Sequence, residues 1–495
     1  MSYLILKKLF EEQSLLNDIC GILHWDMATY MPLKSRKERV KQINKLFDYK
    51  KRIFDEIKKK ELFKKIENLN LKENDRLNLL LMKEKFDYFE AIPFELIQKK
   101  NELSIECEGL WREAKKKSSF NIVKGSLRKL LDQVKIESEI LSQIKNMNRY
   151  DCLMNKYDRS LDSKFVKKIF SKIEKFIKLK LPEINKKKLR SNSLSSEIFL
   201  DENEQFKLSK IFMKKLDFDF DKGRIDKSPH PFCGGGTNDI RITTRFDENN
   251  PFSCFDALMH ETGHGLYEQG LPRKWIHQPL GSAGGMSLHE SQSLFIEMQV
   301  IKSLPVSKFI TRILKSKFKK NNNKFNFLDV FESRIKVEPN FIRVDSDEVY
   351  YPLHIIHRFN IEYKIIEENA DINFLPDLWN QEFSRLMNLD VSNDSNGCLQ
   401  DIHWFGGDLG YFPTYSIGAF IAAQLMNKLK KDIVNFDLVL ENGDFSIISN
   451  WLKKNIHEKG NIYNIDDLLE LVTGEKLNTK HYENHIINRY VNKAF

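Results

Sequence analysis

The chain has 495 residues, 41% of them hydrophobic, which is enough to bury a large core. Its 80 basic and 70 acidic residues give a formal net charge of +10, but the two signs are interspersed along the chain. That mixture is typical of a solvated surface and argues against nucleic-acid binding as the main role. No apolar run reaches the length of about 18 residues that a membrane span needs, so no membrane association is expected.

The opening segment, residues 1–20, places apolar residues at helical spacing with charges between them, which predicts a first helix and not a signal peptide. Six cysteines are scattered with no C-x-x-C pair, which predicts reduced thiols and a cytoplasmic location. They are Cys20, Cys107, Cys152, Cys233, Cys254 and Cys398.

From Ser2 to about Arg190, apolar residues recur at steps of three and four, which predicts long antiparallel helices. No stretch forces a domain boundary. The Lys- and Asn-rich segment 314–327 is flanked by helical patterns and is expected to be a surface connection. We therefore expect one catalytic domain over residues 1–495, with a helical amino-terminal part at 1–190 and the active-site motifs within 228–420.

One segment breaks the helical pattern. Residues 239–246, DIRITTRF, alternate β-branched and charged side chains, which predicts a strand in a small sheet. An edge strand there could hold a substrate backbone in extended form, and a purely structural strand is equally compatible with the sequence. The preceding CGGGTN, residues 233–238, is expected to be a turn.

A possible metal site follows in the segment Phe255–Gly270, FDALMHETGHGLYEQG. His260 and His264 are four residues apart, so on a helix both rings lie on one face and can bind one ion. Glu261 projects beside them, close enough to act as a general base on a water at that ion. A chance polar stripe with this spelling is the competing interpretation.

Catalytic zinc usually has three protein ligands, so a third ligand is expected. Glu290 lies 26 residues after His264, on a second predicted helix with Ser287 as its N-cap. That separation allows the first helix to end and the second to pack antiparallel against it. His289 and Glu297 are rival ligands from the same helix.

These motifs, with four others in the same order, resemble those of the carboxypeptidase Taq family of HExxH metallocarboxypeptidases. The full set is HPF at 230–232, DIRIT at 239–243, HETGH at 260–264, HESQ at 289–292, IRVDSD at 342–347 and GCLQDIHW at 397–404. LHWDMATYMP at 23–32 is also similar to the amino-terminal stretch of that family. One departure is Ser346, where the family usually has alanine.

The resemblance implies a mainly α fold, a single large helical metallopeptidase with a deep active-site groove and a small β-sheet beside the metal helix. It also implies metal ligands at His260, His264 and Glu290, and a homodimer. One divalent metal per subunit is expected: zinc, with cobalt or manganese as alternatives.

Arg343, in FIRVDSDE, is a candidate substrate-binding residue because a guanidinium matches a terminal carboxylate in a planar, bidentate way. The competing interpretation is a structural ion pair with Asp345 or Asp347. His230 is assigned a substrate-side role.

The glycine-rich segment 397–418 has the composition of a shaped loop and concentrates polar and aromatic residues. We select His403 and Tyr411 as donors to the oxyanion of peptide hydrolysis, with a structurally bonded histidine as the alternative. Asp239 or Asp401 is expected to hold the far nitrogen of a ligand histidine, and the sequence does not choose between them.

The sequence therefore predicts a metallocarboxypeptidase that hydrolyses the C-terminal peptide bond of peptides with a free carboxylate and releases single amino acids. The competing enzyme is a thimet-type oligopeptidase, which is also helical with HExxH and a later glutamate. Arg343 and the QDIHW stretch argue against it. A helical binding scaffold with an inactive site is the alternative from another class.

Overall fold

The computed structural model describes residues 1–186, 199–228, 230–317 and 326–492. Helices dominate these residues, and their contacts group the chain into two compact units. Unit 1 comprises Met1–Glu84, Lys188–Lys336 and Gly418–Phe495, and unit 2 comprises Lys85–Lys187 and Val337–Ile417. The single catalytic domain expected over 1–495 stays a prediction. Most of the predicted surface connection lies outside the described residues.

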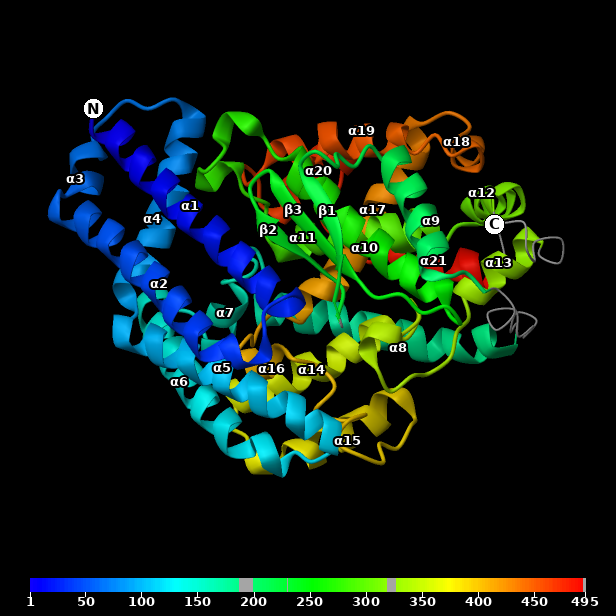
Figure 1. The fold of residues 1–495 in the computed structure, drawn as a ribbon, viewed down its shortest axis with the longest axis horizontal. Coiled ribbons are helices and arrows are strands. Elements are labelled where there is room, and N and C mark those ends of the chain that lie inside the picture. The colour runs from blue at the N-terminus through cyan, green and yellow to red at the C-terminus, as the bar shows by residue number, and fades with distance from the viewer. Residues whose placement is uncertain (187–198, 229, 318–325, 493–495) are drawn as a thin grey trace. The chain divides into compact units, whose positions relative to one another are not determined.

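Two of the four points where the chain passes from one unit to the other lie within helices, namely α4 (Glu73–Ala91) and α17 (Pro413–Asp432). The other α-helices of unit 1 are labelled in Figure 1. They are α1 (Ser2–Thr29), α2 (Arg36–Lys59), α3 (Leu62–Ile66), α9 (Glu202–Lys215), α10 (Pro251–Gly270), α11 (Met286–Leu294), α12 (Leu304–Lys317), α13 (Phe327–Arg334), α18 (Phe436–Asn442), α19 (Ser446–Asn455), α20 (Ile465–Thr473) and α21 (Lys480–Ile486).

The regular secondary structure in the described residues of unit 2 is helical. Its helices are α5 (Phe94–Lys117), α6 (Asn121–Lys145), α7 (Arg149–Met154), α8 (Ser163–Lys186), the 3-10 turn η6 (Arg343–Asp345), α14 (Tyr351–Ile366), the 3-10 turn η7 (Ile372–Phe374), α15 (Leu375–Met387) and α16 (His403–Gly406). The long helices α5 and α6 pack together, as the periodicity predicted. Pro352 lies in the first turn of α14, where a missing amide hydrogen leaves no helical bond unmade.

Within the described residues of unit 1, three strands form one sheet in the order β1-β3-β2. β1 (Gly223–Lys227) runs parallel to β3 (Asp239–Thr244), and β2 (Phe232–Gly236) runs antiparallel to it. The predicted strand is therefore β3, and it is the central strand, so of the two alternatives the edge strand was wrong. The predicted turn was also too long. Most of CGGGTN forms β2, because only Thr237 and Asn238 are needed to connect β2 to β3.

α10 packs on β3 and also against α11, so the sheet lies beside the predicted metal helix, as expected (Figure 1). The crossing of α10 and α11 is close at Gly263. A Cβ there would lie 2.4 Å from the carbonyl oxygen of Gln292 and 2.6 Å from Cα of Ser293. Glycine at this position therefore allows the approach that brings α11 to the two histidines.

None of the described helices has an apolar stretch of the length and hydropathy that crossing a membrane requires.

Candidate active site

His260, His264 and Glu290 converge in unit 1. One nitrogen of each ring and one oxygen of the carboxylate all lie within 4.8 Å of one another. His260 Nε2 is 3.8 Å from Glu290 Oε1, and His264 Nε2 is 3.4 Å from Glu290 Oε2. The three side chains predicted as ligands therefore form a group with the composition of a catalytic zinc site.

The other nitrogen of each ring has a hydrogen-bond acceptor. His264 Nδ1 lies 3.1 Å from the carbonyl oxygen of His289, which can only accept, so Nδ1 carries the hydrogen. Burial lowers the pKa of His264 to about 4, so its ring is neutral and Nε2 presents a lone pair toward Glu290. Two acceptors facing each other at 3.4 Å fit a cation between them.

His260 Nδ1 lies 2.9 Å from Oε2 of Glu297, whose other oxygen accepts from Lys302. Glu297 belongs to η5 (Phe295–Ile301), a π-helical continuation of α11. It was predicted as a rival ligand, and it instead contacts the far nitrogen of a predicted ligand. Its seven-residue spacing from Glu290, which keeps both on one helix face, is the sequence signal that could have identified it.

The two acids that were expected to bind the far nitrogen of a ligand histidine have other partners. Asp239 forms a bidentate pair with Arg241. Asp401 accepts from Arg343 and Arg358. The expectation for Asp239 or Asp401 was wrong, because Nδ1 of His260 faces Glu297 and Nδ1 of His264 faces the carbonyl oxygen of His289.

The other rival ligand and the predicted helix cap also differ from expectation. His289 pairs through Nε2 with Glu268 at 2.8 Å and stacks on His264, so it lies outside the three-residue cluster. α11 begins at Met286 with Gly285 as its N-cap, so Ser287 is not the cap.

Glu261 lies beside the histidines on α10 and is only 7% exposed. Burial raises its pKa, the nearby His260 opposes this, and the balance is a pKa of about 7. A carboxylate whose pKa is near neutrality both accepts and returns a proton readily, which is what a general base of hydrolysis has to do.

Arg343 in unit 2 is 7% exposed and lies in η6. Its Nε donates to Asp401 Oδ1 at 3.0 Å, and its guanidinium lies 4.6 Å from the ring centre of Tyr415. Neither Asp345 nor Asp347, the partners considered from the sequence, binds the Arg343 side chain. Its two terminal nitrogens form no hydrogen bond among the described residues, and they remain suited to a bidentate carboxylate.

His403, also in unit 2, lies at the start of α16. Its Nε2 is 3.0 Å from the hydroxyl of Tyr415, and burial lowers its pKa to about 4. The Tyr411 ring packs 5.5 Å from His403 and 5.2 Å from Tyr415. Tyr415 is thus a further donor candidate that the sequence reasoning did not select.

His230 is exposed, on the connection between β1 and β2 in unit 1. Its carbonyl oxygen accepts from the hydroxyl of Ser228. This bond holds its backbone and does not assign a role to its imidazole.

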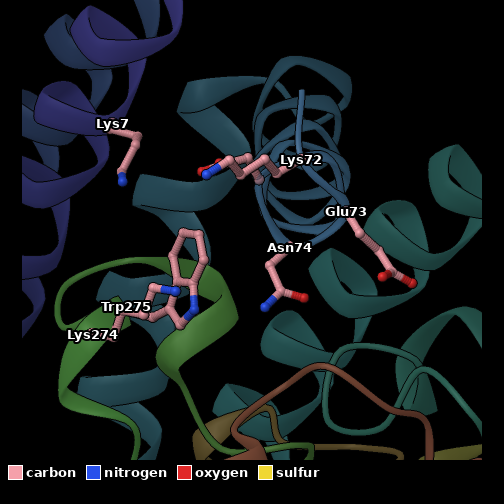
Figure 2. Close-up of a pocket in the computed structure, with 7 residues that line it drawn as sticks. Lys7, Lys72, Glu73, Asn74, Lys274 and Trp275 are labelled. Atoms are coloured by element: carbon pink, nitrogen blue, oxygen red, sulfur yellow. The ribbon is translucent and has the colours of Figure 1, made fainter. Parts of the chain in front are cut away.

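Figure 2 shows a separate surface pocket of about 430 Å³ in unit 1, which contains none of the predicted site residues. Its lining consists of Lys7, Lys72, Glu73, Asn74, Asp75, Lys274 and Trp275. The lining contains both lysines and acidic residues, so its charge favours no one class of ligand.

The helical fold and the cluster of two histidines and a glutamate are typical of a metallopeptidase. Residues 5–490 match the family model of the carboxypeptidase Taq (M32) metallopeptidases. Carboxypeptidase 1 of Bacillus subtilis is 31% identical over 489 residues, covering 96% of this chain and 95% of that protein. Thermostable carboxypeptidase 1 of Pyrococcus furiosus is 31% identical over 477 residues, covering 95% of each protein.

A solved structure of a Pyrococcus furiosus carboxypeptidase is 30% identical, covers 99% of both chains and superposes with a TM-score of 0.91. The chain therefore belongs to the carboxypeptidase Taq (M32) family. It is a metal-dependent carboxypeptidase acting on the C-terminal peptide bond of peptides.

Proposed function

We propose that His260, His264 and Glu290 bind the divalent metal and that zinc is the native ion, with cobalt and manganese as alternatives. Their convergence within 4.8 Å supports this, as do the acceptors on both Nδ1 atoms, which leave the Nε2 lone pairs for an ion. When bound, such an ion acts as a Lewis acid, which lowers the pKa of water and polarises a peptide carbonyl.

Glu261 is the proposed general base. It takes a proton from the attacking water and returns it to the amine that leaves. Its burial beside the proposed ligands supports this role, because a buried carboxylate binds a proton more strongly than an exposed one.

Arg343 is the proposed binding group for the terminal carboxylate of the substrate, which restricts cleavage to the last peptide bond. Asp401 engages only its Nε and so holds the guanidinium in place, with both terminal nitrogens left over. This is the single observation that carries the proposal. His403 and Tyr411 stabilise the oxyanion, and His230 contacts the substrate.

Single amino acids are the expected products. A homodimer and a cytoplasmic location stay predictions. The first rests on the family resemblance, and the second rests on the six unpaired cysteines.

The carboxylate-binding role is tested with one peptide in two forms, a free acid and a C-terminal amide. The intact enzyme is expected to prefer the acid by about 30- to 1000-fold in kcat/KM, the equivalent of one charge-assisted bidentate contact in a dry site. Arg343→Ala and the amide remove opposite halves of one interaction. Their penalties should therefore not add, and the variant should treat both peptides nearly alike.

Arg273→Ala is the matched control, since this arginine lies in unit 1 outside the proposed site. It should keep the preference for the acid. If folded Arg343→Ala protein also keeps the preference for the free acid, another cation binds the terminal carboxylate of the substrate and the proposed role of Arg343 is wrong.

A further inference from the structure

Glu362 on α14 is completely buried and takes no part in the proposed chemistry. Its carboxylate accepts three hydrogen bonds: from the hydroxyl of Tyr150 at 2.6 Å, from Nε1 of Trp404 at 2.7 Å and from the backbone amide of Gly410 at 2.9 Å. A buried carboxylate is costly unless such donors compensate it. The three hydrogen bonds therefore hold the Glu362 carboxylate in one position within unit 2.

Two of these donors flank one segment of the chain. Trp404 directly follows His403, and Gly410 directly precedes Tyr411. The two proposed oxyanion donors thus each lie one peptide bond from a group that Glu362 holds. The third donor, Tyr150, lies on α7 and belongs to another part of the sequence.

The backbone at Gly410 has a second constraint. Its φ is +86°, a value that favours glycine, and a Cβ there would lie 2.7 Å from the backbone nitrogen of Met154 on α7. The backbone that leads into Tyr411 is therefore held between α7 and the Glu362 carboxylate, with no room for a side chain.

The same face of α14 also holds the start of this segment. Arg358, one helical turn before Glu362, donates from Nε to Asp401 at 2.6 Å and from Nη2 to Gln400 at 2.6 Å. Asp401 in turn binds Nε of Arg343. One turn of α14 thus supplies an arginine for residues 400–401 and a carboxylate for residues 404 and 410.

We propose that Glu362 is a positioning residue, which sets the orientation of His403 and Tyr411 by holding Trp404 and Gly410 between them. The inference rests on the proposed function, because it takes these two side chains as the oxyanion donors. It goes further by naming the buried group that places them. Such a residue affects the transition state without touching the substrate.

Glutamine cannot replace this carboxylate without loss. The Trp404 indole donates to Oε1 and the Gly410 amide to Oε2, and neither group can accept a hydrogen bond. In either orientation, the side-chain amide nitrogen that Glu362→Gln introduces would face one of these N–H groups. Glu362→Gln should therefore lower kcat on the order of 10- to 100-fold, with KM and bound metal little changed.

A pair of matched variants separates positioning from stability. Trp404→Phe and Tyr150→Phe each remove one hydrogen-bond donor from the Glu362 carboxylate, but only Trp404 lies in the segment 403–411, which carries His403 and Tyr411. Trp404→Phe also shrinks a buried ring that packs on Trp379 and Phe412, so it should lower the melting temperature more than Tyr150→Phe, and kcat is compared at a temperature where both variants are folded. Trp404→Phe should lower kcat at least several-fold more than Tyr150→Phe, and this pair remains informative if Glu362→Gln does not fold.

Glu382→Gln provides a further control, because Glu382 on α15 binds Asn360 and Arg385 and has no bond to residues 400–411. It should leave kcat within about twofold. Equal kcat values in the two phenylalanine variants, after correction for folded fraction, would overturn the positioning role.

His403→Ala and Tyr411→Phe are measured in parallel. If both keep normal kcat, the assignment of the oxyanion donors is wrong. If either is impaired while folded Glu362→Gln and Trp404→Phe are normal, the oxyanion assignment stands and the role of Glu362 is wrong. The two failures are therefore distinguishable.

Discussion

His260 and Glu297 are joined by a contact of 2.9 Å between Nδ1 and Oε2, although they come from different helices and are 37 residues apart. Glu297 also binds Lys302, which helps to keep the carboxylate ionised. A charged acceptor behind an imidazole fixes its tautomer and makes its other nitrogen a better ligand. The contact thus links the π-helical segment η5 to the proposed metal site.

Glu297→Ala should weaken zinc affinity about 10- to 100-fold, because the His260 ring loses the acceptor that orients it. Competition with a chromophoric chelator measures this constant. Glu268→Ala is the control, since Glu268 binds His289 outside the three-residue cluster. Equal affinity in the Glu297 variant and the intact enzyme would contradict an orienting role.

Glu290→Ala should leave the purified chain with far less than one zinc ion per subunit, because two histidines alone make an incomplete site. Elemental analysis after dialysis measures the content. His289→Ala, which removes a rival ligand, should keep the metal. Full zinc occupancy in the Glu290 variant would instead favour a ligand set that uses another acid.

Glu261→Gln should retain the metal and the fold and still lose about 10²- to 10⁴-fold in kcat, because an amide cannot accept the proton from water. Steady-state kinetics at saturating peptide, alongside the elemental analysis, separate chemistry from binding. Normal turnover at full metal content would rule out Glu261 as the base.

Gly263→Ala should destabilise the chain by about 1 to 3 kcal/mol, because its methyl group would meet the backbone of α11. The displacement of α11 should also weaken zinc binding, because Glu290 moves with it. Gly125→Ala in α6 is the matched control, with nothing within 4 Å of the added Cβ, and should be neutral or slightly stabilising. Thermal melting with and without zinc checks both expectations.

Acid stability should depend on Glu137 in unit 2, which binds Lys100 and Lys156 at 2.5 and 2.9 Å. Burial raises its pKa, the two lysines lower it more strongly, and the pKa falls from 4.5 to about 2. Because the pKa of Glu137 is lower in the folded state, its ionisation stabilises the fold at every pH above the pKa that it has in the unfolded chain. That contribution, on the order of 3 kcal/mol, is lost as the pH falls from about 4.5 toward 2.

Glu137→Gln removes this titration. Urea unfolding at about pH 5 and about pH 3 should therefore show a smaller loss of stability on acidification in the variant than in the intact chain. Identical losses would mean that Glu137 retains an ordinary pKa.

The sequence alone determined those features that depend on local periodicity. The four-residue spacing of His260 and His264 predicts a shared helix face whatever surrounds the helix, and the structure has them on one face of α10. The spacing also allowed a third ligand from the next helix, but it left Glu290, His289 and Glu297 as alternatives, and the family resemblance favoured Glu290. The helical repeats similarly predicted the mainly α fold.

The tertiary structure decided which groups meet when they are distant in sequence. That Glu297 faces His260, that Asp401 and not Asp345 or Asp347 binds Arg343, and that β3 is a central strand all depend on how separate elements pack. On the sequence alone, several acidic residues could have bound His260 or Arg343. Helix crossings and strand register select among them, and they are set by side-chain packing across the fold, which no local pattern encodes.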